Sequence, residues 1–109
     1  DAGGGILDRV YQTILTRKAS PQPDSYVSKL LQGGADRILK KVAEEAGEVI
    51  IAAKNQKREE IIYETADLLF HTLPVLGYHD VTLNEVYREL GTRFGKSGIR
   101  PSPGGGSRG

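Results

Sequence analysis

The chain has 109 residues, no cysteine and a formal net charge of +1 at pH 7. This length favours one domain, the missing thiols exclude disulfides and thiol chemistry, and the small charge gives no global field that would attract nucleic acid or an anionic membrane. No apolar run approaches the roughly 18 residues of a transmembrane helix, and no secretory signal is visible, so we expect a cytoplasmic protein without nucleic-acid or membrane partners.

The N-terminal third predicts two helices. Apolar pairs recur every four residues from Ile6 to Leu15, which indicates a helix of about three turns. This helix should stop before residues 20–23, because two prolines in four residues favour a loop. Ser25 is a suitable cap for a short second helix that Gly33 and Gly34 would close.

Two longer helices should follow. The third is expected from an N-cap at Asp36 to about Asn55, and the fourth begins in the charged connection at residues 57–60. Pro74 is expected to break or kink the fourth helix. The apolar spacing assigns two core faces: Ile38, Val42, Ala46, Val49, Ile50 and Ala53 in the third helix, and Ile61, Thr65, Leu68, Leu69, Thr72 and Leu76 in the fourth.

A fifth helix is predicted near the C-terminus. Thr82 and Glu85 have the spacing of a capping box, and the apolar pattern that follows ends at Gly95. We therefore expect an all-α domain of about five helices at residues 1–98 and a flexible C-terminal tail at residues 99–109. Five helices are too few to cover both long ones, so we expect a homodimer that completes a four-helix core.

Two acidic pairs lie on the two long helices. Glu45 and Glu48 are three residues apart, and Glu64 and Asp67 repeat that spacing after fifteen intervening residues. Residues three apart share a helix face, so an antiparallel pair of helices would bring four carboxylates together. Such a group suits Mg²⁺, which prefers carboxylates, waters and phosphates. The alternative is a solvated acidic face, balanced by neighbouring lysines at positions 40, 41 and 54.

His71 lies one helical turn after Asp67. It is interpreted first as a histidine that packs between helices, and second as a partner of the acidic group or of a substrate. It is a poor candidate for a Mg²⁺ ligand, because hard cations prefer oxygen.

The acidic pattern resembles the signature of the all-α nucleoside triphosphate pyrophosphohydrolases. Within them the match is closer to the phosphoribosyl-ATP pyrophosphohydrolases of histidine biosynthesis, and it covers about residues 6–99. The residues that carry the closer resemblance are Ser25-Tyr26, Leu30-Leu31, Gly33, Lys40-Lys41-Val42, Glu44-Glu45, Ala52-Ala53-Lys54, Glu64, Ala66-Asp67-Leu68-Leu69-Phe70-His71, Arg93 and Ser97-Gly98. Departures are Val27, where the family often has Thr, Pro74, and the glycine-rich ends.

The resemblance implies Mg²⁺-dependent hydrolysis of phosphoribosyl-ATP to phosphoribosyl-AMP and pyrophosphate, the second step of L-histidine biosynthesis, by a homodimer. It implies that Glu45, Glu48, Glu64 and Asp67 hold the metal. Glu44 is expected to position the attacking water or accept its proton. Lys41, Lys54 and Arg93 are expected to contact phosphate, with Lys40 as a weaker candidate.

Two other functions stay open at this point. One is a housekeeping pyrophosphohydrolase that removes non-standard or excess nucleotides with the same acidic site. The other is a helical dimerisation module without chemistry, and the intact set of four acidic residues argues against it.

Overall fold

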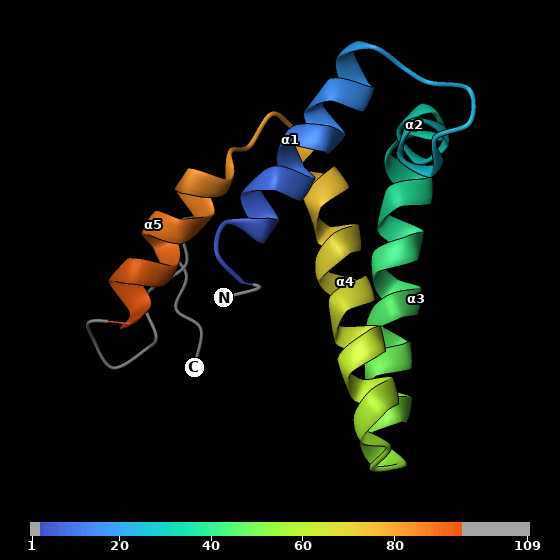
Figure 1. Cartoon of the computed structure of the whole chain (residues 1–109), viewed down its shortest axis with the longest axis vertical. Helices are drawn as coiled ribbons and strands as arrows, with labels where there is room; N and C mark the ends of the chain where they lie inside the picture. Colours follow the sequence, from blue (N-terminus) through green and yellow to red (C-terminus); the bar gives the residue numbers. More distant parts are fainter. Residues whose placement is uncertain (1–2, 95–109) are drawn as a thin grey trace.

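The structure, a computed structural model, describes residues 3–94 and contains no strand in that range. Five helices make up the described chain, as predicted, so the all-α class is confirmed (Figure 1). Their bounds are α1 Ile6–Ala19, α2 Tyr26–Gln32, α3 Gly34–Lys54, α4 Arg58–Tyr78 and α5 Leu83–Phe94. The predicted tail at residues 99–109 and the predicted helix end at Gly95 lie outside the described residues. None of the described helices has the length and apolar character needed to cross a membrane.

The long helices α3 and α4 form an antiparallel pair joined by the short connection at residues 55–57 (Figure 1). At the opposite end of this pair, α1 packs on α4, and α2 packs on both α1 and α3. The last helix, α5, diverges from α3 and α4 (Figure 1). The fold is therefore a long helical hairpin with a small helical cap over one end.

The buried core lies under this cap. Its central cluster consists of Tyr11 and Ile14 from α1, Leu73 from α4 and Leu83 from α5. The Tyr11 hydroxyl donates to the backbone carbonyl of Val81 just before α5. Burial of these apolar side chains provides the main driving force that fixes α1 and the start of α5 on α4.

Two of the predicted helix starts are confirmed by their caps. The Ser25 hydroxyl accepts from the backbone N–H of Ser28 at 3.1 Å. Thr82 and Glu85 exchange the two bonds of a capping box, with Glu85 N–H to Thr82 Oγ1 at 3.1 Å and Thr82 N–H to Glu85 Oε1 at 2.8 Å. Both caps depend only on local sequence, which is why spacing alone located them.

The start of α3 differs from the prediction. The helix begins at Gly34, so Asp36 lies in its first turn instead of capping it. Gly34 has a φ of +85°, a left-handed value that glycine adopts without steric cost. This residue lets the chain turn from α2 into α3 with only Gly33 between them.

Of the break or kink predicted at Pro74, the break is wrong, because α4 continues to Tyr78. Pro74 is buried, so packing against the core offsets the lost backbone bond. Donors from outside the helix satisfy its last carbonyls: Lys18 Nζ donates to the Gly77 carbonyl at 2.8 Å, and Val81 N–H to the Leu76 carbonyl at 2.9 Å. These two bonds complete the last turn of α4, whereas the N–H that Pro74 lacks would have served the carbonyl of Phe70, four residues earlier.

The predicted core faces of the long helices are only partly right. In α3 the buried residues are Ile38, Glu45 and Ala52, spaced by seven, whereas Ile50 and Ala53 are exposed. In α4 the buried residues are His71, Leu73, Pro74 and Gly77, whereas the predicted Thr65 and Leu69 are exposed. The helices meet along one narrow seam, and no other described helix covers the faces that the apolar spacing had selected.

Candidate metal centre and active site

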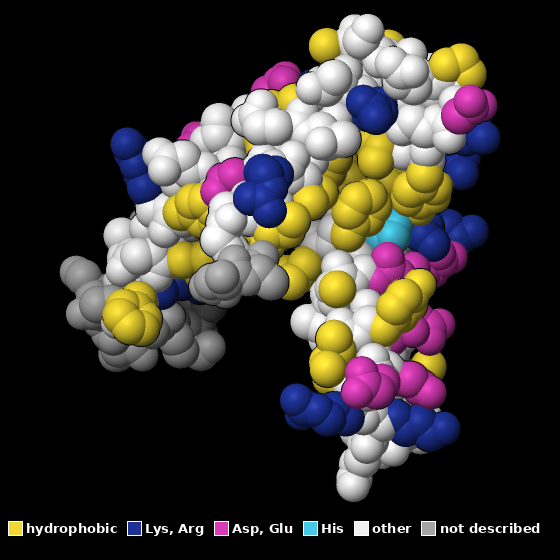
Figure 2. All heavy atoms as spheres, in the orientation of Figure 1, with side chains coloured by type: hydrophobic (Ala, Val, Ile, Leu, Met, Phe, Trp, Pro, Cys, Tyr) yellow, Lys and Arg dark blue, Asp and Glu magenta, His cyan; other side chains and the backbone are white. Residues whose placement is uncertain are grey.

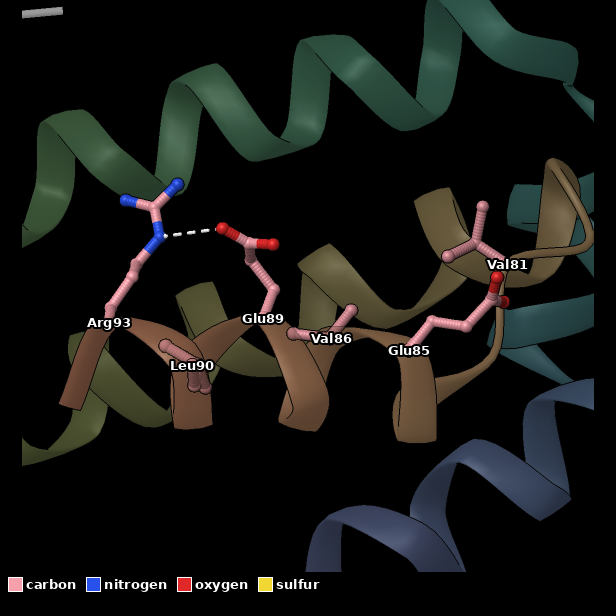
Figure 3. A pocket seen from close by; sticks show the side chains of 6 residues that line it. All are labelled: Val81, Glu85, Val86, Glu89, Leu90 and Arg93. Atoms are coloured by element: carbon pink, nitrogen blue, oxygen red, sulfur yellow. Dashed lines mark hydrogen bonds and ion pairs between the residues drawn. The ribbon is translucent and has the colours of Figure 1, made fainter. Parts of the chain in front are cut away.

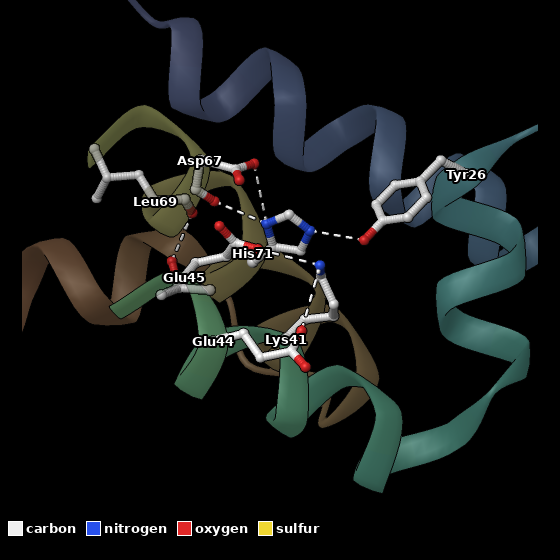
Figure 4. A network of polar contacts seen from close by, with 8 residues as sticks. Tyr26, Lys41, Glu44, Glu45, Asp67, Leu69 and His71 are labelled. Carbon is white, nitrogen blue, oxygen red and sulfur yellow. Dashed lines mark hydrogen bonds and ion pairs between the residues drawn. The ribbon is translucent and has the colours of Figure 1, made fainter. Parts of the chain in front are cut away.

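Glu45 and Asp67 face each other across the seam between α3 and α4 (Figure 4). Glu45 is buried and Asp67 half-buried, and each carboxyl group shifts the pKa of the other. Together with His71 they offer ligand atoms that all lie within 4.8 Å of one another. We call these three residues the α3/α4 cluster.

The two carboxyl groups of the cluster have pKa values that move in opposite directions. Burial and the hydrogen bond to Glu45 raise the pKa of Asp67. The hydrogen bond from Asp67 and the ion pair with Lys41 lower the pKa of Glu45 despite its burial. The opposite directions show that the two carboxyl groups titrate as one interacting pair. A divalent cation bound between them would stabilise the deprotonated form of both.

The remaining acidic residues of the two pairs, Glu48 and Glu64, lie near the cluster. Partial burial, followed by the negative charges of Glu48, Glu45 and Asp67, raises the pKa of Glu64. Glu48 is exposed. The four predicted carboxylates therefore influence one another electrostatically, although only Glu45 and Asp67 face each other across the seam.

Lys41 extends the cluster toward the start of α3. Its Nζ lies 3.1 Å from Glu45 Oε2 and 3.6 Å from Glu44 Oε1. The hydrogen bond to Glu45 raises the pKa of Lys41, so the ammonium form is stabilised. Glu44 is exposed and points away from the seam (Figure 4). Two of the predicted site residues thus lie directly beside the cluster.

His71 does more than pack between helices. Its Nδ1 lies 2.8 Å from the backbone carbonyl of Asp67 and 3.3 Å from the Asp67 carboxylate, and its Nε2 lies 2.8 Å from the Tyr26 hydroxyl. A carbonyl can only accept, so Nδ1 carries the hydrogen, and in the neutral ring Nε2 accepts from Tyr26. Sequence reasoning did not give Tyr26 a role at the site. The available signals were its position directly after the Ser25 cap and its place among the residues that carry the family resemblance.

Lys54 and Arg93 are not brought to the cluster. Lys54 ends α3, nine residues after Glu45, which at 1.5 Å per residue is roughly 13 Å along the helix. Arg93 lies on α5, where its Nε is 3.1 Å from Glu89 Oε2 (Figure 3). Arg93 and Glu89 both line a pocket of about 340 Å³ along α5. In a single chain these two predicted phosphate contacts are separate from the acidic residues.

Comparison with known proteins gives the same family as the resemblance. The family model described as phosphoribosyl-ATP pyrophosphohydrolase matches residues 7–94. The chain belongs to this family. The prediction made from the acidic signature and its neighbouring residues is therefore confirmed.

Curated relatives named phosphoribosyl-ATP pyrophosphatase align over most of the chain. One from Geotalea daltonii is 60% identical over 94 residues, covering 86% of this chain and 89% of the relative. One from Geobacter sulfurreducens is 59% identical, covering 85% and 86% respectively. A more distant one from Neisseria gonorrhoeae is 46% identical over 97 residues, covering 89% and 91%. The family match at residues 7–94 spans the α3/α4 cluster and nearly the whole length of the five helices.

Proposed function

We propose that this chain hydrolyses phosphoribosyl-ATP to phosphoribosyl-AMP and pyrophosphate, the second step of histidine biosynthesis. The observation that carries the proposal is the close grouping of the Glu45, Asp67 and His71 ligand atoms, within 4.8 Å of one another, in a chain whose family is named for this reaction. Carboxylates held together in a partly buried seam are suited to bind a cation that in turn binds phosphates.

The cation proposed is Mg²⁺, held by Glu45, Asp67, Glu48 and Glu64. Support comes from the donor set, because carboxylate oxygens are the ligands that Mg²⁺ prefers, and from the raised pKa of Glu64, which has burial as its first cause and the neighbouring carboxylates as its second. When bound, Mg²⁺ supplies the positive charge that neutralises the phosphate oxygens.

His71 and Tyr26 act as positioning residues in this proposal. Tyr26 is fixed at the start of α2 by the Ser25 cap, and its hydroxyl holds the imidazole of His71. The imidazole in turn contacts both the backbone and the carboxylate of Asp67. This chain of contacts keeps the Asp67 carboxylate directed at Glu45.

The reaction itself adds water across the α–β phosphoanhydride. A bond forms between the water oxygen and phosphorus, the bridging P–O bond breaks, and the water gives up a proton. Glu44, exposed beside the cluster, is proposed to orient that water or accept the proton. Lys41, between Glu44 and Glu45, is proposed to contact a phosphate oxygen.

Lys54 and Arg93 stay candidates for phosphate contacts through a second copy of the chain. We propose a homodimer, because large apolar side chains on α3 and α4 remain exposed in a single chain. They are Ile50, Ile51, Ile62, Tyr63 and Leu69. A second copy that packs on these faces would complete a four-helix core.

The deciding test is pyrophosphate release from phosphoribosyl-ATP, with and without Mg²⁺, by the wild type and by Glu64→Gln. We expect Mg²⁺-dependent release, reduced by about 100-fold or more in the variant, because a metal ligand and a charge at the reacting phosphates are lost. Glu59→Gln, a substitution in the first turn of α4, is the control and should remain active. A folded wild type that releases pyrophosphate only from free nucleoside triphosphates would contradict the proposal and favour the housekeeping function.

A further inference from the structure

A groove of about 390 Å³ runs along the first half of α3, beside the α3/α4 cluster. It is lined by Asp36, Arg37, Lys40, Lys41 and Glu44. Its last residue, Glu44, directly precedes the cluster residue Glu45. Figure 2 shows Lys and Arg side chains next to the histidine and the acidic side chains on this side of the molecule. A molecule bound at the cluster could therefore extend into the groove.

The cations of the groove differ in their partners. Lys41 is already paired with Glu44 and Glu45. Arg37 and Lys40 are exposed, and neither forms an ion pair within the described part of the chain. The groove thus presents two positive charges without an ion-pair partner, on Lys40 and Arg37, which lie roughly one and a half and two helical turns before Glu45.

The position of Arg37 depends on Gly33. Gly33 has an ordinary helical φ of −72°, so its backbone does not require glycine. A Cβ at this position would, however, lie 2.4 Å from Arg37 Cδ and 3.2 Å from Arg37 Cβ. The Arg37 side chain therefore lies over the backbone of residue 33, in space that any larger residue would occupy.

The proposed substrate carries two separate phosphate groups, the triphosphate and the phosphate monoester of its second ribose. We propose that Arg37 and Lys40, in the groove along α3, bind this monoester and thereby select phosphoribosyl-ATP over simple nucleotides. This inference rests on the function proposed above. It adds a specificity site to that function without changing the chemistry at the cluster.

Charge and geometry favour the monoester as the occupant. The triphosphate has its own partners in the metal and Lys41, whereas the monoester is distant from both and needs separate cations. A monoester presents three terminal oxygens, which the planar fork of an arginine can bind through two parallel hydrogen bonds. Lys40 adds a second charge one turn along the same helix.

The test compares steady-state kinetics of the full-length wild type, Arg37→Ala, Lys40→Ala and Gly33→Ala. For Arg37→Ala we expect KM for phosphoribosyl-ATP to rise about tenfold or more with little change in kcat, the result of losing a charge-assisted bond to bound substrate. Inhibition constants of ATP and of magnesium pyrophosphate, which both lack the monoester, should stay unchanged. Arg58→Ala, an exposed arginine at the start of α4, is the matched control and should resemble the wild type.

Gly33→Ala tests the position of Arg37 separately from its charge. We expect it to raise KM for phosphoribosyl-ATP in the wild-type background and to have no further effect in the Arg37→Ala background. Thermal unfolding of each variant checks that the fold is retained.

Two results would overturn the inference. If the wild type is active and KM is unchanged in Arg37→Ala and Lys40→Ala, or the inhibition constants of ATP and pyrophosphate rise as much as KM, the groove does not bind the monoester. If the wild type releases no pyrophosphate from phosphoribosyl-ATP, the proposed function fails and the specificity site fails with it.

Discussion

The two halves of the α3/α4 pair differ in which side chains they bury: one half buries polar side chains, and the other exposes large apolar ones. In the half next to α1 and α2, which we call the site half, the polar residues Glu45 and His71 are 7% and 4% exposed. In the half next to the 55–57 connection, which we call the loop half, Ile50 and Tyr63 are 63% and 68% exposed. The same two helices thus bury charge at one end and present apolar surface at the other.

This inversion separates two functions of one helical pair. In the site half, every buried side-chain nitrogen and oxygen of the described residues has a hydrogen-bond partner, so the burial of these polar groups leaves none of them unsatisfied. In the loop half, the exposed apolar side chains contribute no free energy of burial to the single chain. Their burial needs another protein surface, which a second copy would supply.

The largest effect is expected from a substitution that disrupts the proposed dimer interface in the loop half. Ile62→Glu places a charge on the face that the proposed dimer buries, and an unpaired buried charge costs about 3–5 kcal/mol. We expect the dimer dissociation constant to rise by about 100-fold or more, measured by light scattering over a concentration series. Gln12→Glu, on an exposed position of α1, adds the same charge and should leave assembly unchanged. Identical assembly of both variants and the wild type would remove the loop half from the interface.

In the site half, we expect the stability of the folded chain to depend on pH. The pKa of Asp67 is raised in the folded chain, mainly by burial, so the folded state holds a proton that the unfolded state has lost. Without metal, stability should fall as pH rises from the ordinary carboxyl range through the raised pKa of Asp67. The pKa of Glu45 is lowered, so its contribution to the stability of the folded chain is lost as pH falls. This change lies at lower pH than the one at Asp67.

Mg²⁺ should abolish the loss at higher pH, because the cation takes the place of the proton. The measurement is the melting temperature across pH in EDTA and in Mg²⁺, with Asp67→Asn as the variant that cannot titrate. Parallel curves with and without Mg²⁺ for the wild type would argue against a cation at this pair.

The smallest effect comes from two glycines inside helices. An added Cβ at Gly47 of α3 or at Gly91 of α5 would meet no atom of the described chain within 4 Å. Gly91→Ala should stabilise the fold by up to about 1 kcal/mol through helix propensity. Gly47→Ala should gain less, because the proposed second copy packs on the α3/α4 pair. Chemical denaturation of both variants measures the difference, and equal gains would mean that nothing packs against Gly47.

The parts of the fold that depend on local sequence were predictable. Ser25, Thr82 and Glu85 form their caps with residues at most three positions away. The acidic pairs were also identified from spacing, since the helical repeat fixes which residues share a face. Their contact across α3 and α4 needed the assumption of an antiparallel pair, which a short connection makes natural.

Features that depend on distant partners were not predictable. The bond from Tyr26 to His71 joins residues 45 positions apart, and no local pattern indicates it. Pro74 continues inside α4 because of burial by other helices. The core faces were misassigned because apolar spacing does not show which apolar side chains a single chain covers, and the described helices bury only a narrow seam between α3 and α4.

The contact between Lys18 and the end of α4 has a consequence for the order of folding. α3 and α4 are joined by three residues, so their pairing closes a very short loop, whereas the bond from Lys18 to Gly77 spans 59 residues. Short loops close at lower entropic cost than long ones. The hairpin is therefore expected to form early and α1 to dock late. The cluster carboxylates would then be assembled before Tyr26 arrives to hold His71.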